Sequence, residues 1–268
     1  MSAILKVNNL TYSINDQIFF KDFNMEVEAK KITSIIAPNK SGKTMLTKII
    51  SAIYPTNDIC ILDDISLNKK NVLNYLTKLG IVTNDFNKPF LFKKVKDELA
   101  YPLINLGYKE HIINKKINKI SKFFEIEPLL NKNIDSLDKS LQQKILIIVS
   151  LVHDPKLLIL DDAFSNMNSS DQNFMLGKLK ELNEDGLTIL NITSKLDTIY
   201  NSHIVYVLNN YQIEIKGTVF EIFEKDSYLR KIGLNIPFII DLSLKLKVYN
   251  LIDKIYFDRK SLEDNLWK

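Results

Sequence analysis

Arginine, cysteine and long apolar runs are all scarce in this chain of 268 residues. Its only arginines, Arg230 and Arg259, lie near the C-terminus, so the main body offers no arginine finger for phosphoryl transfer. The single cysteine, Cys60, excludes an internal disulfide, which is typical of a reducing compartment. Because its neighbours are apolar, we expect it to be a buried core residue and not a reactive thiol.

No apolar run approaches the ~20 residues that a membrane-spanning helix requires. The longest, residues 145–152, ends at His153-Asp154-Pro155, and no signal-peptide pattern is present. The net charge of +4 is too small to indicate a nucleic-acid partner. We therefore expect one large globular domain with an appendage, which reaches a membrane only through a partner.

The segment at residues 37–44 carries the strongest chemical signal. A β-branched strand pattern over residues 32–36 precedes it, and helical spacing over residues 45–50 follows it. Strand, loop and helix in this order are what a phosphate-binding P-loop needs, and only its first glycine is replaced, by Ala37. The backbone N–H groups of such a loop and the positive end of the next helix bind phosphate oxygens. The alternative is an ordinary strand-to-helix turn that happens to contain Gly-Lys-Thr.

Two carboxylates complete the predicted nucleotide site. An apolar strand at residues 157–160 delivers Asp161 and Asp162 at its carboxyl end, where ligands bind in open α/β sheets. We expect Lys43 to reach the β- and γ-phosphates, and Thr44 and Asp161 to hold Mg²⁺. Asp162 would polarise the attacking water. The alternative is that the paired acids merely cap a buried strand.

The strand and helix patterns predict an α/β fold with one antiparallel and one largely parallel sheet. Strands over residues 1–36 predict the antiparallel sheet. Strands then alternate with helices, which predicts the parallel sheet; the strands are residues 80–85, 157–160 and 187–193. Residues 86–150 between them are mainly helical, with Pro102 among the predicted breaks, and residues 203–219 form a closing hairpin.

Taken in order, these motifs resemble those of the ATP-binding subunits of ABC transporters, over residues 1 to about 220. Further family motifs are matched less closely. They are the Q-loop at Asn84, the signature at residues 137–144, the D-loop at residues 165–168 and the switch position at Ser194. Residues 95–107 and 229–246 are also similar to the ATPases of energy-coupling factor (ECF) transporters, which take up vitamins and metal ions.

The resemblance implies a P-loop NTPase fold of the ABC ATPase type. It implies an N-terminal antiparallel β subdomain, a RecA-like parallel-sheet core and a helical subdomain at about residues 86–150. Together these would form a nucleotide-binding domain of residues 1–219. Residues 220–268 would form a small helical extension through which two ATPase subunits pair.

The resemblance also assigns roles to individual residues, with ATP and Mg²⁺ as cofactors. The implied ATP-binding residues are Tyr12, Ile14, Ala37, Pro38, Asn39, Lys40, Ser41, Gly42, Lys43, Thr44 and Met45. The implied magnesium ligands are Thr44, Asp161 and Asn84, and the implied catalytic residues are Asp162, Asn84 and Ser194. The implied signature, which caps ATP on a partner subunit, comprises Leu137, Asp138, Lys139, Ser140 and Leu141. Asp97 and Glu98 would contact the membrane subunit.

Several of these positions depart from the family pattern. Asp138 places a carboxylate where the family has a serine facing the γ-phosphate, and Lys139 and Ser140 replace two glycines. Asp162 is one methylene shorter than the family's glutamate, and Ser194 replaces a histidine. A catalytic group misplaced by roughly 1 Å can cost about 100-fold in rate.

The remaining departures lie around the nucleotide. They are Asn84 for glutamine, Lys40 for glycine, and Ile14 for the aromatic residue that stacks on adenine, with Tyr12 two residues away. None of them touches Lys43, Thr44 or Asp161, which carry most of the charge contact with MgATP. We therefore expect that ATP binds and that hydrolysis is slow.

The preferred interpretation is an ATPase subunit of an ECF-type transporter that pairs with a second, more orthodox ATPase. A heterodimer is favoured because two copies of this chain would form two impaired sites. The pair would bind a membrane-embedded T component and a substrate-binding S component at the cytoplasmic face of the cell membrane. Two alternatives stay open: the ATP-binding subunit of another ABC transporter, and a non-hydrolysing structural partner of an active ABC ATPase. A separate membrane protein would select the transported solute.

Overall fold

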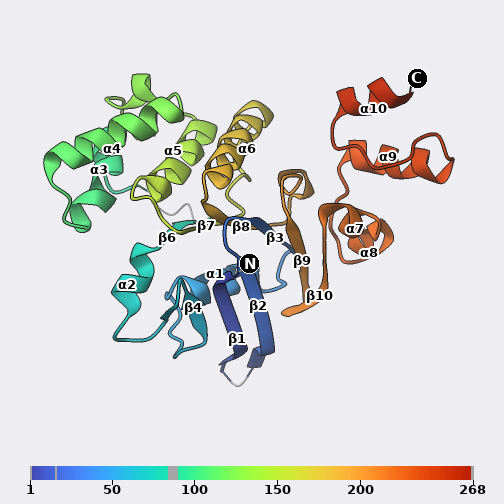
Figure 1. Ribbon diagram of the computed structural model, residues 1–268, viewed down its shortest axis with the longest axis horizontal. Helices are drawn as coiled ribbons and strands as arrows, with labels where there is room; N and C mark the ends of the chain where they lie inside the picture. Colours follow the sequence, from blue (N-terminus) through green and yellow to red (C-terminus); the bar gives the residue numbers. More distant parts are fainter. Residues whose placement is uncertain (1, 16, 84–89, 267–268) are drawn as a thin grey trace.

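Two β-sheets and the helices packed on them make up the structure, a computed structural model that describes residues 2–15, 17–83 and 90–266 (Figure 1). The smaller sheet is antiparallel, with the strand order β2-β1-β4-β5. Its strands are β1 (Ala3–Ile14), β2 (Gln17–Glu28), β4 (Cys60–Leu62) and β5 (Ile65–Ser66). Cys60 is buried in this sheet, as predicted.

The larger sheet has the strand order β10-β9-β3-β8-β7-β6, and its neighbours are parallel except for β9 and β10. Its strands are β3 (Ile32–Ile36), β6 (Leu79–Val82), β7 (Leu157–Asp161), β8 (Thr188–Thr193), β9 (Ile204–Asn209) and β10 (Gln212–Gly217). Every residue of β3, β7 and β8 is buried, which explains their nearly continuous apolar sequences. Because β3, β8 and β7 are parallel, the loops that follow them gather at one edge of the sheet.

Helix α1 (Lys43–Ile50) lies between the two sheets. Leu46, Ile49 and Ile50 on this helix share one core with Leu5 of β1 and Ile159 of β7. The short helices α2 (Val72–Thr77) and η3 (Leu196–Thr198) lie on connections between strands. Packing on both sides therefore fixes the position of α1 and of the loop that precedes it.

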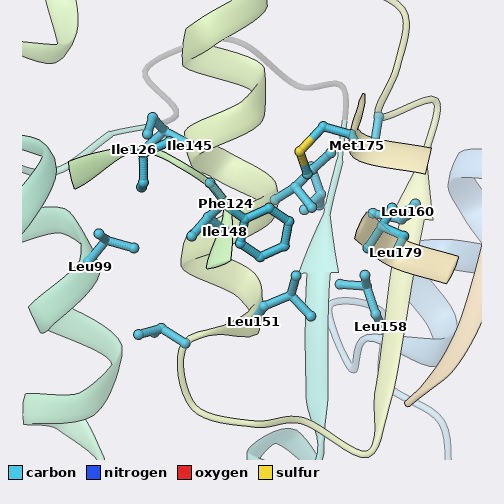
Figure 2. Packing of buried hydrophobic residues seen from close by; sticks show 14 of the residues in the cluster. Leu99, Phe124, Ile126, Ile145, Ile148, Leu151, Leu158, Leu160, Met175 and Leu179 are labelled. Atoms are coloured by element: carbon cyan, nitrogen blue, oxygen red, sulfur yellow. The ribbon is translucent and has the colours of Figure 1, made fainter. Parts of the chain in front are cut away.

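A second hydrophobic core joins the larger sheet to the helices shown at the upper left and top centre of Figure 1. These elements are α3 (Val95–Asn105), α4 (Glu110–Phe123), η1 (Glu127–Leu129), η2 (Ile134–Ser136), α5 (Lys139–Leu151) and α6 (Ser169–Glu184). Figure 2 shows Ile148 of α5 and Leu158 of β7 in this core, with Leu179 of α6 nearby. Pro102 lies inside α3 and does not break it, contrary to the prediction. Burial of Leu99 and Leu103 on the same helix outweighs the hydrogen bond lost at the proline.

The C-terminal part of the chain packs against β9 as a third cluster. Its helices are α7 (Val219–Phe223), α8 (Asp226–Lys231), α9 (Phe238–Val248) and α10 (Arg259–Leu266). Phe223 and Leu229 pack with Val205 and Val207 of β9. No helix within residues 2–15, 17–83 and 90–266 has the length and apolar character needed to span a bilayer.

Candidate nucleotide-binding site

The loop between β3 and α1 has the backbone form that an anion cradle requires. Lys40 and Gly42 both have left-handed backbone angles, with φ of 65° and 105°, and the Ser41 hydroxyl donates to the Pro38 carbonyl at 2.7 Å. Leu46 N–H donates to the Gly42 carbonyl, which is the first hydrogen bond of α1. The N–H groups just before Leu46 therefore point out of the helix end, where they can bind phosphate oxygens.

Lys43 is held under this loop, with only 6% of its surface exposed. Its Nζ donates to the Ala37 carbonyl at 3.0 Å and lies 3.4 Å from Oδ2 of Asp162. The Thr44 side chain, one residue later, is exposed. A buried ammonium and an exposed hydroxyl thus lie at the positive end of α1.

Asp161 ends β7 and is only 2% exposed. Burial raises its pKa to about 6, and the neighbouring Asp162 carboxylate adds to the rise. The Thr47 hydroxyl, Lys43 and Lys48 oppose it. A buried carboxylate with a raised pKa next to a second carboxylate favours a bound cation, and oxygen donors are the ligands that Mg²⁺ prefers. The donors present here therefore fit magnesium.

Asp162 and Ser194 lie together at the same edge of the sheet. Asp162 Oδ1 accepts hydrogen bonds from the Ser194 N–H at 2.9 Å and from its hydroxyl at 3.4 Å. Asp162 also has a left-handed backbone, with φ of 47°. The structure thus brings Lys43, Asp162 and Ser194 into one cluster. Asn84, the predicted Q-loop residue, lies outside the described residues.

The two residues predicted on β1 to contact the base differ in their surroundings. Ile14 is 37% exposed, but the Tyr12 ring is stacked on Tyr54, with centroids 5.7 Å apart and planes 11° apart. One face of Tyr12 is therefore already covered within the chain. Ile14 has no aromatic ring, and Tyr12 has one remaining ring face for a nucleobase.

The signature residues make contacts that the sequence did not predict. Asp138 is the N-cap of α5, and its carboxylate accepts the Leu141 N–H at 2.9 Å. Ser140 donates to Asp171 Oδ2, and its hydroxyl accepts the Asn168 N–H at 3.2 Å. The Asp138 charge is thus partly compensated by the start of α5, and Ser140 connects the predicted signature to the predicted D-loop.

Asp97 and Glu98 do not form the exposed acidic pair that we expected. Asp97 is exposed, but Glu98 is buried and accepts the N–H groups of Leu91 at 3.0 Å and Phe92 at 2.8 Å. Burial raises the pKa of Glu98, against the effect of these two N–H groups. The prediction that Glu98 offers its carboxylate to a partner is therefore corrected, because this carboxylate already accepts hydrogen bonds from the loop before α3.

Two residues at the site were missed by the sequence reasoning. Thr47 interacts with Asp161 from the first turns of α1, and Lys195 Nζ donates to the Phe164 carbonyl at 3.1 Å. Thr47 lies four residues after Lys43, one helical turn along the same face. That spacing could have predicted that Thr47 lies at the site. The Lys195 contact joins two loops about 30 residues apart, and no local pattern predicts it.

Comparison with known proteins gives a consistent result. Residues 20–165 match the ABC transporter family. The energy-coupling factor transporter ATP-binding protein EcfA1 of Lactobacillus acidophilus is 29% identical over 244 residues, which cover 89% of this chain and 86% of the relative. EcfA1 of Leuconostoc mesenteroides is 26% identical over 267 residues, covering 98% and 97%. The solved structure of CbiO1 from Clostridium perfringens, described as part of the ABC transporter complex CbiONQ, has a TM-score of 0.76 at 25% identity and covers 88% of this chain and 97% of that one.

The loop after β3, the carboxylates at the end of β7 and the polar residue after β8 define a P-loop nucleotide-binding protein. The family match spans more than half of the sequence, and the chain belongs to the ABC transporter family. The predicted ABC ATPase fold and the predicted similarity to ECF ATPases are both confirmed. ATP binding and hydrolysis are the general activity of ATPases of this family.

Asp161→Asn is expected to stabilise the nucleotide-free protein. The raised pKa means that the ionised carboxylate costs folding free energy at pH 7.5, about 2–3 kcal/mol for a rise from 3.8 to about 6. Removing the charge should raise the melting temperature by roughly 5 °C without magnesium. The gain should shrink as the pH falls toward 4.5, because the wild-type Asp161 then becomes protonated in the folded state.

Thermal melting with and without MgATP checks this expectation. The variant should lose most of the stabilisation that MgATP gives the wild type, because it lacks a ligand charge. Equal melting temperatures for the wild type and Asp161→Asn at pH 7.5 would contradict the inference that Asp161 carries a buried charge in the folded protein. Asp185→Asn, at an exposed helix end, is the matched control and should change neither quantity.

Proposed function

We propose that this chain is the ATP-binding subunit of an ECF-type uptake transporter for vitamins or metal ions. The proposal that the chain binds ATP is supported by the cluster of Lys43, Asp162 and Ser194 beside the P-loop. The transporter class is supported by the similarity to EcfA1 proteins, which extends over 98% of the chain in one relative and so includes the C-terminal helices.

Different residues at this edge of the larger sheet would bind different parts of MgATP. The loop N–H groups and Lys43 would hold the phosphates, while Tyr12 and Ile14 were the predicted base contacts. Thr44 and Asp161 would hold Mg²⁺, which neutralises charge on the phosphates. Asn84 stays a proposed further ligand. Lys43 Nζ, now 3.4 Å from Asp162, would turn toward the incoming phosphates.

Slow hydrolysis follows from the short side chains at the catalytic positions. Asp162 is held back by Lys43 and Ser194, and it lacks the methylene that would carry its carboxylate toward an attacking water. Ser194 cannot reach as far as a histidine. These contacts also favour a second candidate function, a non-hydrolysing partner whose dimerisation matters more than its turnover. An ATP-binding subunit of a different ABC transporter remains the third.

The chain would act as part of a larger assembly at the cytoplasmic face of the membrane. We divide it into a nucleotide-binding domain, residues 1–219, and a dimerisation extension, residues 220–268. Phe238, Val248 and Tyr249 in the extension are each more than 70% exposed, as expected of a surface that a second ATPase covers. The membrane contacts would be a T component, reached through Asp97, and an S component.

Purified protein tests the proposal directly. Calorimetry should detect MgATP binding that chelation of magnesium weakens. ATP turnover should be low for the chain alone and should rise when a second ABC ATPase and the T component are co-expressed with it. Absence of MgATP binding would refute the proposal, while binding with no turnover in the full assembly would favour the non-hydrolysing partner.

Substitutions of Asp97 and Glu98 are expected to have separate effects, on partner binding and on stability respectively. Asp97→Lys should lower the melting temperature only slightly, because a carboxylate is lost from the first turn of α3, and it should reduce co-purification with the T component, because an exposed charge is reversed. Glu98→Ala should lower stability by about 2 kcal/mol, because it leaves the N–H groups of Leu91 and Phe92 without their acceptor. Thermal melting and pull-down of the membrane subunit measure the two effects. Equal melting temperatures for the two variants would contradict the buried role of Glu98.

A further inference from the structure

The turn between β9 and β10 contains an unusual residue. Asn210 and Tyr211 both have left-handed backbones, with φ of 46° and 63°. A two-residue hairpin turn of this kind favours glycine at its second position, and a bulky residue with positive φ is an outlier. Such an outlier persists when its surroundings hold it in place, and it often lies at a functional site.

The surroundings that hold Tyr211 are the P-loop. Its N–H donates to the Ser41 carbonyl at 3.1 Å. Its ring lies so close to Gly42 that a Cβ atom added there would be 2.5 Å from Tyr211 Cδ1. Since β9 runs parallel to β3, the turn after β9 lies at the same sheet edge as the P-loop. Tyr211 is therefore an aromatic residue placed directly against the phosphate cradle.

A second aromatic residue meets Tyr211 from the antiparallel sheet. Tyr12 pairs with Phe20, and Ser13 pairs with Ile18, so Phe19 is an extra residue in β2 and forms a β-bulge. The Phe19 ring contacts Tyr211 edge-on, with centroids 5.2 Å apart and planes 77° apart. Bulges next to binding sites commonly turn a side chain toward the site. Phe19 and Tyr211 are both half-buried, so each keeps part of its ring accessible.

This aromatic pair is rigidly supported. The fully buried Phe20 packs edge-on against Tyr211 at 5.5 Å. Gln212, the next residue in β10, donates from Nε2 to the Lys21 carbonyl of β2 at 3.1 Å, and β10 lies beside β2 in Figure 1. The pair thus bridges the two sheets next to the P-loop. On β1, by contrast, Ile14 has no ring and one face of Tyr12 is covered by Tyr54.

We propose that Phe19 and Tyr211 form the surface on which the nucleobase of the bound nucleotide rests. The proposal rests on the proposed function, because the P-loop must hold the triphosphate. An aromatic surface contributes binding free energy through the base and not through the phosphates. Stacking of this kind typically changes affinity by about tenfold per base. The chain would in this way replace the aromatic contact that is lost at Ile14.

Calorimetry with two probes, MgATP and magnesium tripolyphosphate, tests the proposal. Phe19→Leu should weaken MgATP binding about tenfold and change tripolyphosphate binding less than twofold. Tyr211→Gly removes the second ring at a backbone position that glycine suits, and it should show the same pattern. Ile18→Ala is the matched control, because Ile18 is the neighbouring β2 residue and is 57% exposed. It should change neither affinity.

The outcomes separate this inference from the function on which it rests. Wild-type protein that binds neither probe refutes the proposed function itself. Equal losses for both probes in Phe19→Leu and Tyr211→Gly would mean that the rings only brace the P-loop, and would overturn the base contact. Unchanged MgATP affinity in both variants would overturn it as well. So would a tenfold gain in MgATP affinity from Ile14→Tyr, because the base would then lie over β1.

Discussion

Lys43→Ala is expected to weaken MgATP binding by at least about 100-fold. Lys43 is the buried cation at the start of α1, with its Nζ 3.0 Å from the Ala37 carbonyl and 3.4 Å from Asp162. Removing it deletes a charge-assisted contact to phosphate and leaves the carboxylates at the end of β7 without their nearby cation. Truncating one partner of a buried, hydrogen-bonded charge pair in a binding interface typically costs about 2–5 kcal/mol, and tenfold in affinity corresponds to about 1.4 kcal/mol.

Titration calorimetry of the wild type and three variants measures this effect. Lys43→Arg keeps the charge but presents a planar fork, so its affinity should be intermediate. Lys31→Ala removes a lysine that pairs with Glu28 on the surface, and its affinity should equal that of the wild type. Melting curves establish that each variant is folded. If folded Lys43→Ala bound MgATP within threefold of the wild type, the P-loop assignment would be wrong.

Strand order explains why much of this site was predictable from the sequence. Apolar runs predicted buried parallel strands, and the carboxyl ends of such strands share one edge. Lys43 after β3, Asp162 after β7 and Ser194 after β8 therefore had to come close together, and they do. The spacing of glycine and lysine in the loop was equally informative, because few residue types other than glycine tolerate the left-handed backbone angles of this loop.

Contacts between distant side chains were not predictable in the same way. Glu98 turns inward to Leu91 and Phe92 only because the loop before α3 folds back over it. Tyr12 pairs with Tyr54 across 42 positions of sequence, and Tyr211 reaches Gly42 across an even longer separation. Such pairs depend on how complete elements pack, and a single sequence carries no periodic signal for them.

Asp162→Glu combined with Ser194→His is expected to raise ATP turnover by about 100-fold in the assembly with a second ABC ATPase. The added methylene of glutamate moves the carboxylate roughly 1 Å outward, and misplacement by that distance can cost about 100-fold in rate. Histidine at position 194 would supply a longer donor than the serine hydroxyl, which now lies 3.4 Å from Asp162. MgATP affinity should change little, because Lys43, Thr44 and Asp161 are untouched.

The matched control for this gain is Asp162→Gln combined with Ser194→His, which has the same side-chain length without the carboxylate. Steady-state phosphate release in the assembly compares the two double variants with the wild type. The glutamate variant should be fast and the glutamine variant should stay at background, because only a carboxylate can polarise the attacking water. Equal rates for the two would show that a carboxylate at position 162 does not drive hydrolysis, and a glutamate variant no faster than the wild type would show that side-chain length there does not limit it.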